Sequence, residues 1–215
     1  MVMLLSMVKR YLLLPQAMSS LRLLILTAMM SGGLSLAQSP VAAENPNETV
    51  IAQELQRTQT EPDSVASVTI AAPVGFVFEF LTNRPHDYTD NAVDVAFDHN
   101  GSEIPNGLGR GSIRTITLEN GDTLFQRFLL FDQPATYAYA TDMDRSTVSL
   151  PLNYSIARYE LTELTDSSTA LRVSLVYQPS SRLLAFIVRR AFRSALQNEF
   201  ERAVEVIETQ WRNSP

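Results

Sequence analysis

The sequence predicts an α+β domain in which a curved antiparallel sheet closes around one long C-terminal helix. From residue 65 onward, short segments alternate apolar and polar residues, which is the period of half-buried strands. Asn120-Gly121 separates two such segments and is a typical signal for a tight hairpin. Residues 181–211 keep apolar residues at helical spacing, and this segment is long enough to cover the apolar face of the sheet.

The elements follow in a clear order along the chain. Residues 65–71 are rich in β-branched residues and predict the first strand. Pro73 suits the start of a helix, and a second short helix begins at Pro85 and reaches Tyr88. Six further strands are predicted, over residues 93–98, 112–119, 122–131, 136–141, 154–164 and 169–178. About seven strands therefore precede the final helix.

Residues 1–37 predict a signal peptide. Three basic residues come first, an apolar run over 23–30 follows, and Ser35-Leu36-Ala37 offers small residues for cleavage before Gln38. An uncleaved membrane anchor is the alternative, although the apolar run is short for a spanning helix. Both interpretations place the domain outside the cytoplasm, in the periplasm or the extracellular space.

The remaining chain divides into a tether and one domain. Residues 38–63 are rich in Pro, Asn, Gln, Glu and Thr and predict a flexible tether, with one short helix between Glu48 and Arg57 that is too short to be stable alone. Residues 64–212 form the predicted domain.

Composition excludes several function classes. The whole chain carries a net charge of −6, and its first basic residues belong to the leader, so the domain is more acidic still and unsuited to general nucleic-acid binding. There is no cysteine for a thiolate nucleophile, a disulfide or a lipid anchor, and Lys9 is the only lysine. No cofactor fingerprint is found, so no cofactor is expected.

Several motifs resemble the SRPBCC superfamily, which includes START-like, polyketide cyclase/dehydrase-like and birch-pollen-allergen-type proteins. The opening motif is matched by Ile70-Ala71-Ala72-Pro73 followed by Val77-Phe78-Glu79-Phe80-Leu81. The middle and last motifs are matched by Gly107–Gly111 with Arg114, Gly121, Gln126-Arg127, Asp132-Gln133-Pro134, Tyr159-Glu160-Leu161 and 169–173. The resemblance implies a helix-grip fold with an elongated apolar cavity between sheet and helix, used for binding or transfer in some members and catalysis in others.

Two positions depart from the family pattern. Tyr88 stands where the family often has Trp, and Gln126 stands where it often has Glu, which removes a cavity acid. No universal set of catalytic residues can be carried over.

The hairpin signal predicts which residues face the interior. If Asn120 and Gly121 are the two tip residues, Thr115 lies opposite Gln126, and Arg114 lies opposite Arg127. Two opposed arginines favour water, so both are placed outside. The inner set is then Ile113, Thr115, Thr117, Leu124, Gln126 and Phe128.

The predicted cavity candidates combine apolar walls with a few hydroxyls and one amide, which suits an apolar ligand with orienting hydrogen bonds. The alternative is that the tyrosines, Tyr137 among them, only fill the core. The candidates are Tyr88, Phe97, Thr115, Gln126, Phe128, Tyr139, Tyr159, Tyr177, Ala191 and Ala195.

Two further patterns concern the histidines and the arginines of the final helix. His86 and His99 are the only histidines and lack metal-ligand spacing, so no metal is expected. Arg182, Arg189 and Arg193 share one face of the final helix, which indicates either weak contact with an anionic membrane surface or a solvated face balanced by glutamates such as Glu199.

Three functions remain open. The first is an exported carrier or binder of an apolar small molecule or lipid. The second is a cyclase- or dehydratase-like enzyme, which is disfavoured because no buried acid or base is expected, unless an arginine beside Tyr139 or Tyr159 lowers a phenol pKa. The third is an envelope interaction module without a ligand.

Overall fold

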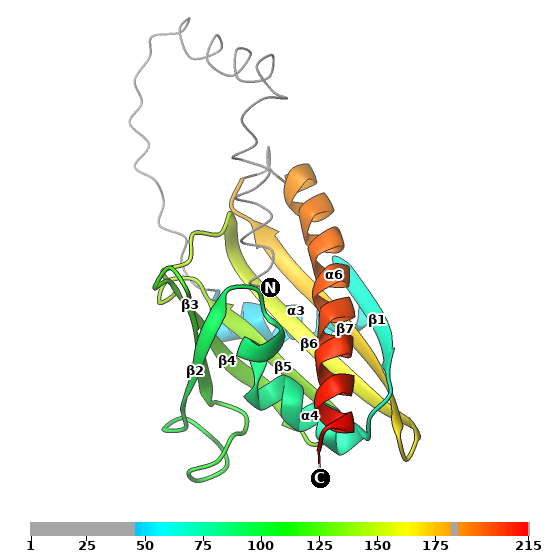
Figure 1. Cartoon of the computed structure of the whole chain (residues 1–215). Helices are drawn as coiled ribbons and strands as arrows, with labels where there is room; N and C mark the ends of the chain where they lie inside the picture. Colours follow the sequence, from blue (N-terminus) through cyan, green and yellow to red (C-terminus); the bar gives the residue numbers. More distant parts are fainter. Residues whose placement is uncertain (1–45, 182–184, 215) are drawn as a thin grey trace, which may run out of the picture.

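The structure is a computed structural model and describes residues 46–181 and 185–214. Its elements are α3 (Glu48–Thr60), β1 (Ser64–Ile70), α4 (Val74–Asn83), α5 (Pro85–Tyr88), β2 (Ala92–Asp98), β3 (Ile113–Leu118), β4 (Thr123–Asp132), β5 (Thr136–Asp142), β6 (Leu152–Thr165), β7 (Ser168–Pro179) and α6 (Ala185–Arg212). The strands form one antiparallel sheet in the order β1-β7-β6-β5-β4-β3-β2, and α6 runs along its inner face (Figure 1). The predicted sheet, its two short helices and its long C-terminal helix are confirmed.

The main core lies between the inner face and α6. The helix contributes one stripe of buried residues at helical spacing: Phe192, Ala195, Leu196, Phe200, Ala203 and Ile207. Near the end of α6, Trp211 is 36% exposed, and its ring centroid lies 5.1 Å from that of Phe76 on α4. The stripe therefore holds the helix against the sheet over most of its described length.

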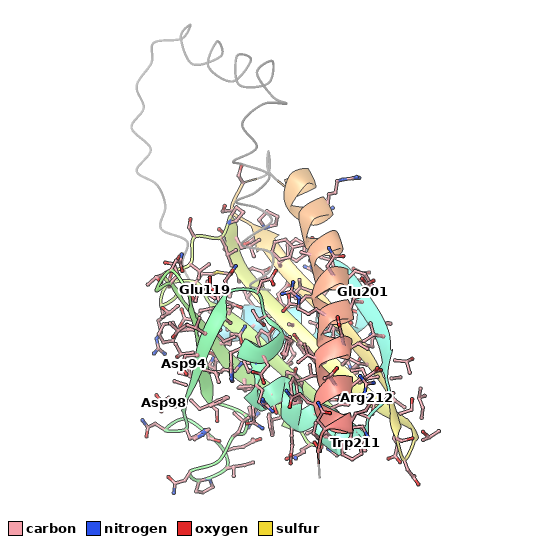
Figure 2. All side chains as sticks on the ribbon, in the orientation of Figure 1. Asp94, Asp98, Glu119, Glu201, Trp211 and Arg212 are labelled. Atoms are coloured by element: carbon pink, nitrogen blue, oxygen red, sulfur yellow. The ribbon has the colours of Figure 1, made fainter. Side chains whose placement is uncertain are left out.

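The free edge of the sheet at β2 carries charge. Asp94 and Asp98 are exposed along this strand (Figure 2), as their alternation with apolar residues predicts. Charged side chains on an edge strand disfavour pairing with another chain.

The β3–β4 hairpin differs from the prediction by one residue. Leu118 N–H donates to Asp122 O over 2.9 Å, so the loop has three residues, 119–121, and Gly121 adopts a positive φ of 82°. Arg114, not Thr115, therefore lies opposite Gln126.

A one-residue shift exchanges the two faces of a strand, so part of the predicted inner set is wrong. The side chains of Ile113, Thr115 and Thr117 are half-buried on the outer face, and Arg114 is buried on the inner face. Arg127 is outside, as predicted, and its Nη2 lies 2.7 Å from Glu48 Oε1.

The short helix predicted between Glu48 and Arg57 is present and extends to Thr60 as α3. It packs on the outer face, behind the sheet in Figure 1, so these residues are not the predicted flexible tether. Asn47 caps the helix by accepting a hydrogen bond from Val50 N–H over 3.0 Å. Ile51 packs with Ile156 and Val176 in a small cluster separate from the main core. A helix that is marginal alone is thus stabilised by packing on the sheet.

The predicted signal peptide, residues 1–37, lies outside the described residues. Among residues 46–181 and 185–214, no helix is both long and apolar enough to cross a membrane.

Candidate binding site between the sheet and the C-terminal helix

Most of the predicted cavity residues lie in the interior between sheet and α6. Buried there are Tyr88, Gln126, Phe128, Tyr139, Tyr159, Tyr177 and Ala195. Phe97 is half-buried against the same core, and its ring stacks on His99 with centroids 6.0 Å apart. Ala191 lies on α6, but its side chain is outside the described part of the structure. The prediction that Thr115 faces the interior is wrong, because the register of the hairpin places its side chain on the outer face.

Arg114 on β3 is the central polar side chain of this interior and is 2% exposed. Its Nε and Nη2 donate to Gln126 Oε1 over 2.9 and 2.6 Å. Its Nη1 donates to the carbonyls of Leu81 and Thr82 over 3.2 and 2.9 Å. These carbonyls belong to the last turn of α4, where a helix leaves its own carbonyls unpaired. Arg114 therefore caps α4 and ties it to the sheet.

The guanidinium of Arg114 also lies among aromatic rings. Its central carbon is 5.3 Å from the ring centroid of Phe128 and 5.1 Å from that of Tyr139, which is cation–π geometry. Gln126 lies inside, as expected, but its oxygen already accepts two hydrogen bonds from Arg114. In this structure its amide positions the arginine.

Four tyrosines surround this centre. The hydroxyl of Tyr88 donates to Leu81 O over 3.1 Å, and the hydroxyls of Tyr139 and Tyr159 lie 3.2 Å apart. The ring of Tyr137 stacks on that of Tyr159, with centroids 4.3 Å apart. The Tyr137 hydroxyl is buried and has no hydrogen-bond partner among the described residues.

Glu199 brings a carboxyl group into the same interior from α6. It is 4% exposed, although its charge predicts a solvated position. Its spacing could have revealed it, because Glu199 lies four residues from both Ala195 and Ala203 and shares their buried stripe. Its negative charge is among the causes that raise the pKa values of Tyr88, Tyr137, Tyr139 and Tyr159.

The interior phenols are poor acids. Burial is the largest cause that raises the pKa of Tyr137 and Tyr159 well above the usual range, and it raises the pKa of Tyr139 as well. The positive charge of Arg114 lowers the pKa of Tyr137 and Tyr139 without offsetting burial. Arg114 therefore does not bring the pKa of Tyr137 or Tyr139 below the usual range of a phenol, which the enzyme interpretation requires.

Two pockets outlined by the described residues lie on the outer face of the sheet. The larger has a volume of about 590 Å³ and is lined by residues of β1, β5, β6 and β7, including Thr136, Glu160 and Arg172. The smaller, of about 130 Å³, lies beside α3 and includes Arg127 and Tyr154. Neither includes Arg114 or a predicted cavity residue.

The two histidines lie in separate places. His86 Nε2 is 3.5 Å from Asp87 Oδ1, and His99 Nδ1 is 3.1 Å from the hydroxyl of the buried Ser112. The described part of the chain holds no group of three His, Cys, Asp or Glu side chains arranged for a metal ion.

The arginine stripe is described only in part. Arg189 is exposed on α6, whereas the side chains of Arg182 and Arg193 are outside the described residues. Contact with a membrane surface through these three residues stays a prediction.

Solved structures with similar backbones identify the fold. A truncated norcoclaurine synthase from Thalictrum flavum superposes with a TM-score of 0.51 at 14% identity, covering 70% of this chain and 93% of that one. Ara h 8.0201 gives 0.50 at 16% identity, covering 67% and 96%. The protein XoxI from Bacillus cereus gives 0.50 at 13% identity, covering 70% and 95%. The chain shares the helix-grip fold of these proteins, as the sequence motifs imply.

No protein-family model matches the sequence, and no curated protein matches it. At these identities the solved structures establish the fold alone.

Proposed function

We propose that this chain is an exported protein that binds a small molecule with an apolar body and a polar group, in the interior between the sheet and α6. Aromatic walls suit an apolar body, because each square ångström of apolar surface removed from water stabilises binding by about 25 cal/mol. A norcoclaurine synthase of the same fold holds dopamine and hydroxybenzaldehyde, which are small aromatic molecules with polar groups. The signal-peptide pattern predicted for residues 1–37 supports export.

The observation that carries this proposal is the hydroxyl of Tyr137. A buried hydroxyl without a partner costs about 1–3 kcal/mol, so natural interiors rarely keep one without a reason. Its ring is fixed by stacking on Tyr159 and by edge contact with Phe78, with ring centroids 4.3 and 5.6 Å away. The polar group of a bound molecule would give this hydroxyl a hydrogen-bond partner.

Native mass spectrometry of the gently purified protein tests the proposal. We expect a bound molecule of defined mass, less of it on Tyr137→Phe, and a ligand-free Tyr137→Phe protein that is more stable by about 1 kcal/mol, because an unsatisfied group is removed. Tyr139→Phe is the matched control, since its hydroxyl already has Tyr159 as a partner. Equal occupancy in the parent and Tyr137→Phe proteins, or no bound molecule at all, would contradict the proposal.

Export has its own test. N-terminal sequencing of protein from the envelope fraction should begin near Gln38. A full-length chain in that fraction would instead indicate an uncleaved anchor, and a full-length chain in the cytosol would contradict export.

An enzyme remains the second candidate because of one observation. Glu199 is a buried carboxyl group beside the tyrosines, and general acid–base catalysis needs such a group in the site. If the chain is an enzyme, the co-purified molecule should change mass on incubation with the parent protein and not with Glu199→Gln. An unchanged mass with both proteins supports the binder.

A further inference from the structure

Adjacent residues of β7 contact the helix α3 on the outer face of the sheet and the helix α6 on the inner face. The side chain of Val176 is fully buried under α3, in the cluster with Ile51. The next residue, Tyr177, points to the other face, where its ring centroid lies 4.5 Å from that of Phe192 on α6. A displacement of this short stretch of β7 would therefore change the contacts of both helices.

Asp63 holds this part of β7 in place. The strand β1 begins at Ser64, which pairs with Leu175, so it does not reach the backbone N–H of Tyr177. Asp63 N–H donates to Leu175 O over 2.9 Å, and Asp63 Oδ2 accepts from Tyr177 N–H over 3.1 Å. The carboxylate thus stands in for the next residue of a neighbouring strand.

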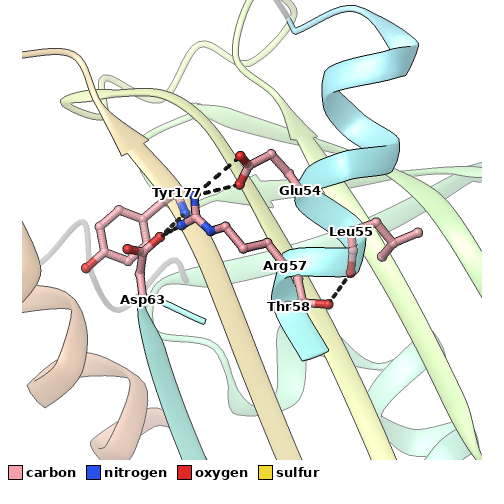
Figure 3. A network of polar contacts seen from close by, with 6 residues as sticks. All are labelled: Glu54, Leu55, Arg57, Thr58, Asp63 and Tyr177. Carbon is pink, nitrogen blue, oxygen red and sulfur yellow. Dashed lines mark hydrogen bonds and ion pairs between the residues drawn. The ribbon is translucent and has the colours of Figure 1, made fainter. Parts of the chain in front are cut away.

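Arg57 connects the same carboxylate to α3. Its Nη2 pairs with Asp63 Oδ2, and its Nη1 lies 2.9 Å from Glu54 Oε2 (Figure 3). One oxygen atom therefore binds both the guanidinium of α3 and the backbone of β7. The side chains of Arg57 and Asp63 are 32% and 17% exposed, so the pair is only partly shielded from water.

The contacts of α3 favour release as a unit. The helix has 13 residues, which is marginal without tertiary packing, and Ile51, at 9% exposed, is its one buried apolar side chain. Its cluster on the outer face is separate from the main core. Detachment of α3 would remove this small cluster and leave most of the main core in place, which is the condition for a local opening.

We propose that Arg57 and Asp63 form a latch that couples the docking of α3 on the outer face to the packing of α6 on the inner face. When α3 is docked, the latch holds β7 at Tyr177 and so supports the contact with Phe192. When α3 leaves, this end of β7 loosens and α6 loses that support. The consequence for a ligand rests on the proposed function: a molecule bound between sheet and α6 strengthens the docking of α3, because coupling between two sites is reciprocal.

Hydrogen–deuterium exchange on the full-length, ligand-free chain tests the latch. In Arg57→Gln we expect the amides of residues 174–179 and 189–203 to exchange about tenfold faster, a typical size for coupling between sites. The matched control is Arg127→Gln, which also removes an ion pair between α3 and the sheet, but one at Glu48 and distant from Tyr177. There we expect faster exchange only in the first half of α3, next to Glu48, and no change in residues 189–203, because the pair of Arg57 with Asp63 stays in place.

Unchanged exchange of residues 189–203 in Arg57→Gln, or equal acceleration in both variants, would overturn the latch. If Arg57→Gln does not fold, Ile51→Ala replaces it, because it weakens the apolar contact of α3 with the sheet and should accelerate exchange in the same segments. Since no ligand is present, this result is independent of the proposed function, which is tested separately by native mass spectrometry.

Discussion

The two faces of one sheet use charge in opposite ways. On the inner face, Arg114 is 2% exposed and makes four hydrogen bonds to fixed acceptors. On the outer face, Arg127 forms an ion pair with Glu48, and the side chains of these two residues are 36% and 78% exposed. Removing the inner charge leaves buried acceptors unpaired, whereas water replaces an exposed partner. The charge on the inner face is thus part of the packed core, whereas the ion pair on the outer face is accessible to water.

Alkaline pH should produce the largest difference between the faces. Burial raises the pKa of the inner residues Tyr137, Tyr139 and Tyr159, so these phenols keep their protons in the folded state when the unfolded chain loses them. These phenols do not change the free energy of unfolding below about pH 10. Above this pH they lower it by about 1.4 kcal/mol per pH unit for each phenol that stays protonated in the folded state. Urea unfolding at rising pH measures this slope.

The outer tyrosine separates the two contributions. Burial, assisted by the charge of Glu54, raises the pKa of Tyr154 to about 12. Tyr154→Phe should therefore reduce the slope by the share of one phenol and leave most of it in place. A slope that disappears in Tyr154→Phe would place the alkaline sensitivity on the outer face.

Substitution of Arg114 should have the next largest effect. Arg114→Leu leaves Gln126 and the α4 carbonyls of Leu81 and Thr82 without their donor, and we expect a loss of about 3 kcal/mol in the free energy of unfolding. Arg114→Lys should lose less, because an ammonium can still reach one acceptor. Urea denaturation decides, and a loss below about 1 kcal/mol in Arg114→Leu would show that the buried arginine does not hold α4.

A matched pair on β7 compares the packing of the two faces directly. Val173 and Val176 are both buried, the first in the main core and the second under α3. We expect Val173→Ala to cost about 2 kcal/mol and Val176→Ala about 1 kcal/mol, because α3 can settle onto the smaller side chain. Equal losses by urea denaturation would mean that α3 is packed as rigidly as α6.

The smallest effect is expected at Arg127. Its ion pair with Glu48 is exposed, and such pairs contribute about 0.5 kcal/mol. Arg127→Gln should change stability by this amount at low salt and by less at high salt. A loss above about 2 kcal/mol that is independent of salt would make this pair part of the core.

Sequence periodicity was sufficient for the elements of the domain and insufficient for one hairpin. Strand β7 and helix α6 form where the alternation and the helical spacing predict them, and their apolar residues Leu171, Val173, Phe200 and Ile207 are buried. Asn120-Gly121 is compatible with loops of two or three residues, and the choice between them reverses the faces of β3. That choice decides whether Arg114 lies in water or in the core.

The order of strands and helices in residues 64–212 follows from the sequence alone, because the apolar face of the sheet must be covered and the final helix is the predicted element long and apolar enough to cover it. Tertiary structure alone decided where the charges lie. Arg114 is buried because the end of α4 offers it carbonyls, and Glu199 is buried because it shares a stripe with Ala195 and Ala203. It also decided that α3 is a docked helix, since a marginal helix forms only where another surface covers its apolar side.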